Sequence, residues 1–302
     1  LNRYPDGDCF TLRHALSRDL KVNPQQLIFG NGSDEIIVLV VRAFIHPGDE
    51  VIIADPSFLV YNIASLIEGA KVKRVALKDF RYDLTQMKRQ ITAKTKIVFI
   101  GNPDNPAGTY IRQKEMEAFL KGLPSRVLVF VDEAYYEFVK ANDYVNSLGL
   151  LKRYKNLIVT RTFSKLYGLA GLRIGYGIAH QPLIDILNRV REPFNVNTLA
   201  QMAALACLKN KAYYAKLAQK IEDQKKFLYK EFNRRGISFV ESWTNFILVQ
   251  TKNQAPKVAG QLCRQGVIVR DMSYWGLKKY IRVTVGTPQE NLRLLNALEE
   301  IL

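Results

Sequence analysis

Short, almost uninterrupted apolar runs recur between residues 26 and 180, and they limit the possible folds more than any other feature. The runs predicted as β-strands are QLIF (26–29), EVIIA (50–54), KIVFI (96–100), RVLVFV (126–131), NLIVT (156–160) and RIGYGIA (173–179). Amphipathic segments separate them, and residues 33–45 and 112–121 are predicted as helices. Strands that are apolar on both faces are typical of a mostly parallel sheet covered by helices. The sequence therefore predicts an α/β domain.

Beyond residue 180 the pattern changes to longer and more polar segments. Residues 195–236 are rich in Ala, Leu and Lys and are predicted to form a long helix that stops at Gly236. The segments after it are predicted as strands near 244–251, 267–272 and 280–286 and a closing helix over 288–302. We therefore expect a large α/β domain over residues 1–190 and a smaller C-terminal α+β domain over 191–302, entered through the long helix.

Polar loops, three of which contain glycine, follow several of the predicted strands. They are GNGSDE (30–35), DPSF (55–58), GNPDNPAG (101–108), DEAYYE (132–137) and RTFSKLYG (161–168). In an open parallel sheet, ligands bind beyond the carboxyl ends of the strands. The five loops are therefore predicted to meet in one cleft that forms an active site.

The chain carries a formal net charge of +16, which raises the alternative of a non-catalytic basic protein that binds nucleic acid. Its Lys and Arg residues are spread along the chain, and the densest tracts are KRYK (152–155) and DQKK (223–226). A dispersed charge favours a solvated basic surface, so we expect no nucleic-acid partner. The same field would attract anionic small molecules, including phosphorylated ones.

The cysteines and histidines form no pattern typical of a metal site or a disulfide framework. They are Cys9, Cys207, Cys263, His14, His46 and His180. Scattered cysteines fit a reducing cytoplasm. No apolar run approaches the roughly 20 residues that cross a bilayer, and the first ten residues lack the features of a secretory signal. The sequence therefore predicts a cytoplasmic protein without a metal or a membrane partner.

Lys165 is the first candidate for chemistry, because it follows a predicted strand in a mostly apolar loop. Removal from water lowers the pKa of a lysine amine and frees its lone pair for nucleophilic attack. The hydroxyls of Thr162 and Ser164 and the guanidinium of Arg173 form a suitable set for holding a phosphate. An exposed loop lysine without chemical function is the alternative that this motif leaves open.

Asp132 ends a strand so apolar that a buried carboxylate there needs a partner. A cationic pyridinium nitrogen is such a partner, and Tyr135 is placed to offer its phenol to the same ligand. A solvent-facing strand end is the alternative. Glu133 is expected to be a surface or helix-start residue.

Four further residues carry side chains that could bind a phosphorylated aromatic ligand. The Asn105 amide can hydrogen-bond a phenolic oxygen, although turn formation also explains its loop. Ser33 and Asp34 open a helix whose amino end can bind an anion, or they simply cap it. Phe58 can stack on an aromatic ring or belong to the core.

Two arginines, Arg270 and Arg282, lie within otherwise apolar predicted strands of the second domain. Arginine at such positions favours bidentate recognition of a carboxylate or a phosphate. The alternative is that their stems lie along the sheet edge while the guanidinium groups stay in solvent.

Taken together, these motifs resemble the aminotransferases of the type I pyridoxal-phosphate-dependent fold, and most closely the histidinol-phosphate aminotransferase subfamily. The resemblance covers almost the whole chain. It rests on NRYPDG (2–7), GNGSDE (30–35), GNPDNPAGT (101–109), DEAYYEF (132–138), TFSKLYGLAGLRIGYG (162–177), PFNVN (193–197), VIVRDM (267–272) and YIRVTVGTPQEN (280–291).

The resemblance implies pyridoxal 5'-phosphate as cofactor and gives a role to each candidate residue. Lys165 is then the lysine that binds the cofactor covalently and later moves the proton. Asp132 pairs with the pyridine nitrogen, Asn105 and Tyr135 hold the ring hydroxyl, and Phe58 stacks on the ring. The family often has Tyr at this last position, so a hydroxyl is lost here.

The resemblance also implies phosphate and substrate sites and a homodimer. Tyr4 matches a tyrosine that reaches the cofactor phosphate of the partner subunit, and Arg270 and Arg282 match receptors for the acidic groups of substrates. The remaining residues around the phosphate are then Ser33, Asp34, Thr162, Ser164 and Arg173.

The activity implied is an exchange of amino groups between glutamate and 2-oxoglutarate on one side and histidinol phosphate and imidazole-acetol phosphate on the other. An aromatic amino-acid aminotransferase is an alternative, as is a lyase or decarboxylase of the same fold. Members of the family carry a further N-terminal segment that helps to cover the substrate. This chain begins after it, and we expect it to be part of a longer protein.

Overall fold

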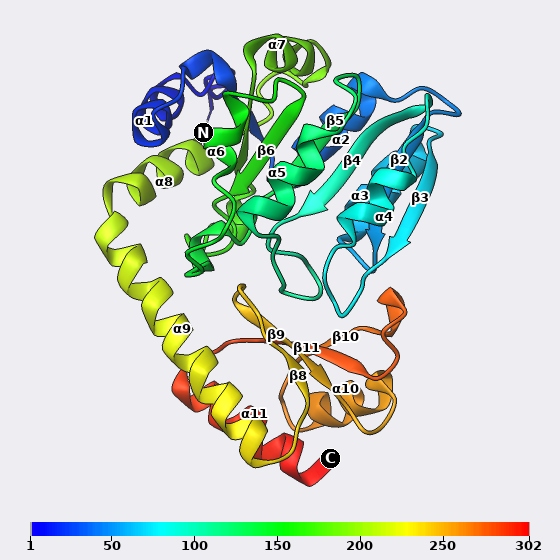
Figure 1. Cartoon of the computed structure of the whole chain (residues 1–302). Helices are drawn as coiled ribbons and strands as arrows, with labels where there is room; N and C mark the ends of the chain where they lie inside the picture. The colour runs from blue at the N-terminus through cyan, green and yellow to red at the C-terminus, as the bar shows by residue number, and fades with distance from the viewer. Residues whose placement is uncertain (1, 302) are drawn as a thin grey trace.

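The computed structural model describes residues 2–301, which form two β-sheets covered by helices (Figure 1). The larger sheet has seven strands in the order β1-β7-β6-β5-β4-β2-β3. Its strands are β1 (Leu27–Gly30), β2 (Glu50–Asp55), β3 (Lys71–Ala76), β4 (Thr95–Gly101), β5 (Leu128–Asp132), β6 (Leu157–Thr162) and β7 (Gly175–Ala179).

The middle of the larger sheet is parallel and buried on both faces. Strands β3, β2, β4, β5 and β6 pair in parallel, whereas β7 is antiparallel to both of its neighbours. Successive side chains of a strand point to opposite faces. Ile97 and Phe99 therefore belong to one core, and Val98 and Ile100 to the other. These two cores explain the nearly continuous apolar runs in the sequence.

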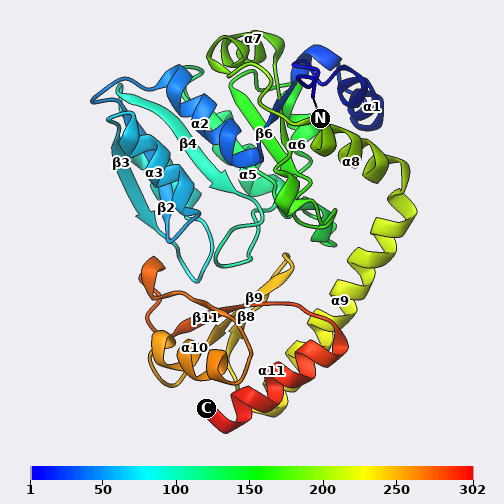
Figure 2. The same ribbon diagram turned by 180° about the vertical axis from the view of Figure 1, so that it is seen from behind.

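Helices cover both faces of this sheet, as the two opposite views show (Figures 1 and 2). One face packs against α2 (Ser33–Phe44), α3 (Leu59–Ile67) and α7 (Gln181–Val190). The other packs against α1 (Phe10–Leu20), α4 (Leu84–Arg89), α5 (Gln113–Lys121), α6 (Ser147–Leu151) and α8 (Thr198–Lys209). Short 3₁₀ turns are η1 (Pro24–Gln26), η2 (Tyr136–Phe138), η3 (Ala170–Leu172) and η4 (Ser273–Trp275).

The smaller sheet is antiparallel and has a core of its own. Its order is β10-β11-β9-β8, with β8 (Phe239–Val240), β9 (Phe246–Gln250), β10 (Arg270–Asp271) and β11 (Tyr280–Thr284). The helices that pack against it are α9 (Lys211–Arg234), α10 (Ala255–Arg264) and α11 (Pro288–Ile301). Helix α9 runs from the larger sheet to the smaller one along one side of the molecule (Figure 1).

The predicted α/β class is confirmed, and the differences lie in single elements. The long helix expected over 195–236 is two helices, because Asn210 leaves helical geometry and its side chain caps the end of α8 by donating to the Ala206 carbonyl. The edge strand β3 was missed, since its sequence KVKRVA is basic and mostly exposed. The strand expected over 267–272 pairs only at Arg270 and Asp271. The domain division at residues 190 and 191 stays a prediction.

Two negative observations concern the described residues only. In residues 2–301 no helix combines the length and apolar character needed to cross a membrane. Within the same residues, no group of three His, Cys, Asp or Glu side chains is placed to hold a metal ion.

Two leucines of α11 provide a test of the smaller core. Leu295 is 0% exposed and Leu292 is 51% exposed on the same helix. We expect Leu295→Ala to lower the free energy of unfolding by roughly 2–5 kcal/mol, because it leaves a cavity among apolar neighbours. Leu292→Ala is the matched control and should change it by less than about 0.5 kcal/mol. Urea unfolding followed by circular dichroism measures both, and equal losses would contradict the packing described.

Candidate active site

A cavity of about 250 Å³ lies at the carboxyl ends of β4, β5 and β6. All five loops expected to meet there contribute to its wall, so the predicted convergence is confirmed. The lining residues are Ser33, Asp34, Phe58, Tyr61, Gly101, Pro103, Asn105, Asp132, Ala134, Tyr135, Thr162, Ser164, Lys165 and Arg173.

Asp132 is a buried carboxylate in the cavity wall and has neutral hydrogen-bond donors. Its Oδ2 accepts a 2.9 Å hydrogen bond from the Tyr61 hydroxyl, and its Oδ1 accepts one of 3.0 Å from the Ala134 backbone N–H. The Thr160 hydroxyl lies 3.4 Å from the same Oδ1. Burial raises the pKa of Asp132 to about 6, because these neutral donors only partly offset the loss of water. A cation next to Asp132 would therefore be strongly favoured.

Tyr61 is a site residue that the sequence reasoning missed. Its ring is buried and stacks on Phe99 with ring centroids 4.8 Å apart. Phe58 lies one helical turn earlier, and its ring meets Tyr61 edge-on at 5.5 Å. The spacing of these two aromatic residues, three positions apart at the start of a helix, was the available signal. Both side chains line the cavity, and the Tyr61 hydroxyl also contacts Asp132.

Asn105 links the two sheets across the rim of the cavity. Its Nδ2 donates a 3.3 Å hydrogen bond to the Tyr135 hydroxyl, and its Oδ1 accepts one from the Arg282 guanidinium. The guanidinium carbon of Arg282 also lies 4.8 Å from the centre of the Phe246 ring. Burial lowers the pKa of Arg282. A buried guanidinium whose partner is a neutral amide favours an added anion.

Lys165 lies in the cavity wall, but its side chain is exposed, which differs from the apolar setting expected. The buried positions of its loop are taken by the neighbouring Phe163 and Leu166. The Lys165 ammonium lies 5.2 Å from the centre of the Tyr135 ring. Lysine nitrogen, phenol and Asn105 amide therefore face the same volume.

The amino end of α2 forms the opposite wall. Gly32 precedes the helix with φ of 81°, and a Cβ there would lie 2.5 Å from an Arg173 nitrogen. The guanidinium of Arg173 forms a 3.0 Å ion pair with Asp34. Free backbone N–H groups, the helix dipole and a guanidinium together make this wall suitable for a phosphate.

Three predicted site residues, Tyr4, Arg270 and Arg282, are not among the described residues that line the cavity, and Arg282 reaches its rim only through the bond to Asn105. Tyr4 is 82% exposed and stacks on Phe194 with ring centroids 4.8 Å apart. Arg270 is exposed on β10 and is the cross-strand neighbour of Arg282. The structure therefore brings Arg282 to the cavity and leaves Arg270 at its outer side.

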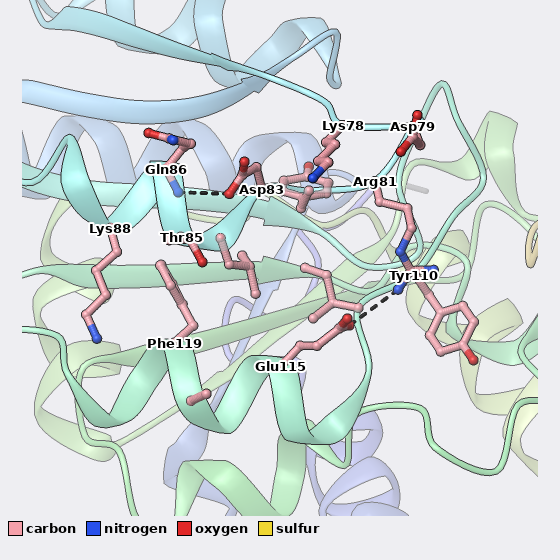
Figure 3. Close-up of a pocket in the computed structure, with 14 residues that line it drawn as sticks. Lys78, Asp79, Arg81, Asp83, Thr85, Gln86, Lys88, Tyr110, Glu115 and Phe119 are labelled. Atoms are coloured by element: carbon pink, nitrogen blue, oxygen red, sulfur yellow. Dashed lines mark hydrogen bonds and ion pairs between the residues drawn. The ribbon is translucent and has the colours of Figure 1, made fainter.

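A larger groove of about 810 Å³ lies between α4 and α5 (Figure 3). Its charges are mixed in sign, and Arg81 forms an ion pair with Glu115 across it at 3.3 Å. None of the predicted site residues is among the described residues that line it. The groove therefore does not compete with the smaller cavity as the candidate active site.

The family model for aminotransferase class I and II matches residues 1–298. The chain belongs to this family. It is 45% identical over 300 residues to a histidinol-phosphate aminotransferase of Moorella thermoacetica, an alignment that covers 99% of this chain and 78% of that protein.

Solved structures share the fold of this chain. The histidinol-phosphate aminotransferase of Sinorhizobium meliloti in complex with pyridoxal-5'-phosphate superposes with a TM-score of 0.93 at 27% identity, over 99% of this chain and 82% of that one. The L-threonine-O-3-phosphate decarboxylase of Porphyromonas gingivalis superposes with a TM-score of 0.87 at 26% identity, over 99% and 90% of the two chains. The predicted type I fold is thereby confirmed for this aminotransferase.

Behind the cavity of this aminotransferase lies a charge cluster in which Glu133 and Arg161 are buried and Glu137 is half-buried. The prediction that Glu133 lies at the surface is wrong: it is 0% exposed and forms a 2.8 Å ion pair with Arg161. Glu137 is close enough for its pKa to respond to both. Burial raises the pKa of Glu137 to about 7, and its Oε2 is buried without a hydrogen-bond partner among the described residues.

This raised pKa gives a prediction for stability against pH. Folded protein keeps a proton on Glu137 up to about pH 7, whereas the unfolded chain releases it near pH 4.5. Wild-type protein therefore loses stability as pH rises through this interval. Relative to wild type, Glu137→Gln should gain on the order of 3 kcal/mol in the free energy of unfolding between pH 5 and 8.

Urea unfolding at several pH values measures this difference. Glu192→Gln is the control, since its side chain is 71% exposed, and its difference from wild type should not vary with pH. A pH-independent difference for Glu137→Gln as well would contradict a buried, protonated Glu137.

Proposed function

We propose that this aminotransferase binds pyridoxal 5'-phosphate in the 250 Å³ cavity and exchanges amino groups between glutamate and histidinol phosphate. In one direction glutamate and imidazole-acetol phosphate give 2-oxoglutarate and histidinol phosphate, and the reverse direction regenerates glutamate and imidazole-acetol phosphate. The observation that carries the proposal is the meeting of Lys165, Asp132, Asn105 and Arg173 around one volume. The similarity to histidinol-phosphate aminotransferases over 99% of the chain supports it.

The residues present fit the cofactor. Asp132 is a buried carboxylate that forms no ion pair within 4.0 Å among residues 2–301, and a protonated pyridine nitrogen would supply the missing positive charge. Asn105 and Tyr135 lie 3.3 Å from each other, so both can reach one phenolic oxygen. The phosphate is proposed to lie at the amino end of α2, with hydroxyl and guanidinium donors from Ser33, Thr162, Ser164 and Arg173. Asp34 and Arg173 form an ion pair at the same place.

Each side chain then has a defined task. When bound, the cofactor's protonated ring withdraws electron density from the α carbon of the substrate. Asp132 keeps the proton on the ring nitrogen, and the Tyr61 hydroxyl holds Asp132 in place. Lys165 would anchor the cofactor through its Nζ, and the same amine, once free, would be the base that takes the proton from the substrate α carbon. Phe58 fixes the plane of the ring.

Arg282 and Arg270 are proposed to bind the acidic groups of the substrates. Arg282 already reaches the rim of the cavity and donates to Asn105. A carboxylate can replace that amide and would form a stronger, charge-assisted bond. Arg270 is the cross-strand neighbour of Arg282 and extends the basic surface outward, where a phosphate could bind.

We also propose that the functional unit is a cytoplasmic homodimer. Exposed apolar side chains gather where the N-terminal segment meets α8, and Tyr4 and Phe194 already stack on each other. Contact with a second copy would remove this surface from water. The exposed residues there are Tyr4, Phe10, Phe194, Leu199 and Met202. Tyr4, which lies on this surface, is proposed to contact the cofactor phosphate of the partner subunit.

An aromatic amino-acid aminotransferase is a second candidate, because imidazole and phenyl rings need similar pockets. A decarboxylase is a third, favoured by the superposition with the L-threonine-O-3-phosphate decarboxylase. Ratios of kcat/KM for histidinol phosphate and phenylalanine separate the first two. We expect histidinol phosphate to be preferred. Release of CO₂ without consumption of 2-oxoglutarate would favour the third candidate.

The role of Lys165 gives a direct prediction for turnover. Lys165→Ala should lower kcat at least a hundredfold, since it removes both the anchor and the proton carrier. Lys155→Ala is the matched control, an exposed lysine outside the cavity, and should keep the wild-type rate. The rate of 2-oxoglutarate consumption with histidinol phosphate measures both. Sustained turnover of Lys165→Ala at the wild-type rate would contradict the proposal.

A further inference from the structure

The buried pair of Arg161 and Glu133 lies directly behind the cavity. Along β5, Val129 and Val131 point to one core and Phe130 to the other. By the same alternation Glu133 continues the row of Val129 and Val131, on the face opposite to Asp132. Arg161 of β6 likewise follows Val159 on that face. The pair therefore joins the two strands on the side away from the cavity.

The neighbours of this pair in the sequence are the candidate site residues. Asp132 immediately precedes Glu133, and Thr162 immediately follows Arg161. Lys165 lies four residues beyond Arg161. Any movement of one strand end against the other would change the position of Lys165 relative to Asp132. The ion pair adds a charged side-chain link to the parallel pairing of β5 and β6. It lies beside the 2.8 Å bond from the Glu133 N–H to the Thr160 carbonyl and the 3.4 Å contact of the Thr160 hydroxyl with Asp132.

The pair is more constrained than a surface ion pair. Arg161 is 5% exposed, and its guanidinium carbon lies 3.5 Å from the centre of the Tyr136 ring. Its Nε donates to Glu133 Oε2 at 2.8 Å. Contacts above and beside the guanidinium leave it few alternative positions. The ends of β5 and β6, together with the turn that carries Tyr136, are therefore locked to each other.

Stability alone does not explain this arrangement. Replacing a buried ion pair by apolar residues of similar volume is often neutral or stabilising. The cluster also contains a second carboxylate, Glu137, and Oε1 of Glu133 is buried without a hydrogen-bond partner among the described residues. Burying these charged groups costs free energy of folding. The positions of the strand ends that the ion pair fixes explain the cluster better.

We propose that Arg161 and Glu133 are positioning residues, which set the distance and orientation between Asp132 and Lys165. The proposal rests on the proposed function, because it assigns these two groups to one bound cofactor. It gives the pair a role in catalysis without contact to the cofactor or the substrate. The covalent anchor and the partner of the ring nitrogen lie on different strands, and this pair ties those strands together.

The test compares two double variants. Glu133→Gln with Arg161→Met removes the charges of the pair and keeps the volume, so neither partner is left as an unpaired buried charge, and folding is expected below about pH 7, where Glu137 keeps its proton. Glu50→Gln with Lys73→Met is the matched control. It removes a 2.8 Å ion pair between β2 and β3 of the same sheet, at the amino end of β2 and away from the cavity.

Two readouts besides activity are measured: the dissociation constant of pyridoxal 5'-phosphate, and the pH midpoint at which the absorbance of the bound cofactor changes. For E133Q/R161M we expect roughly tenfold weaker binding, as when orienting partners are removed in metal sites. We also expect a shift of the pH midpoint by about one unit. E50Q/K73M should match wild type in both, whatever its melting temperature. Arg161→Lys, which keeps the charge, should lie between wild type and E133Q/R161M.

Wild-type affinity and an unchanged pH midpoint in E133Q/R161M would overturn the positioning role while leaving the proposed function intact. Equal changes in E50Q/K73M would overturn it too, since the effect would then follow from general destabilisation. If E133Q/R161M does not fold, the same two measurements on Arg161→Lys replace it. Wild-type values for both would then overturn the positioning role. Failure of the wild-type protein to bind the cofactor would instead reject the proposed function itself.

Discussion

The parallel register of β4, β5 and β6 is the constraint on which the candidate site depends. It places Gly101 beside Asp132, and Asp132 beside Thr160. Because side chains alternate along a strand, a slip of one residue would exchange Asp132 for Glu133 at the cavity wall. The buried apolar residues on both faces hold this register. The core of the larger sheet therefore decides which carboxylate faces the cavity and which faces Arg161.

Much of this arrangement could be predicted, because strands and loops leave patterns in short stretches of the sequence. Apolar runs predicted the buried strands, and the polar loops that follow them predicted most of the cavity wall, Asn105 and Asp132 included. Contacts between distant residues were not predictable in this way. The bond between Tyr61 and Asp132 joins residues 71 positions apart, and the burial of Glu133 depends on Arg161 of the next strand. The exposure of Lys165 likewise depends on which neighbours fill the core.

Burial prepares two charged groups of the site for ligands of opposite charge. It raises the pKa of Asp132 and lowers the pKa of Arg282, because each charge has only neutral or partial compensation. A cationic ring nitrogen and an anionic substrate group would relieve both costs. The formal net charge of +16 further favours the approach of phosphorylated and carboxylated molecules. The candidate site and the basic surface therefore both favour phosphorylated and carboxylated ligands.

The central claim, that Lys165 binds pyridoxal 5'-phosphate in this cavity, is tested most directly by the site of covalent attachment. Borohydride reduces the bond between a lysine nitrogen and the cofactor's carbonyl carbon and makes it permanent. Mass spectrometry of the digested protein then identifies the modified lysine. The account predicts one cofactor per chain, attached to Lys165. Attachment to another lysine, or no attachment at all, would contradict it.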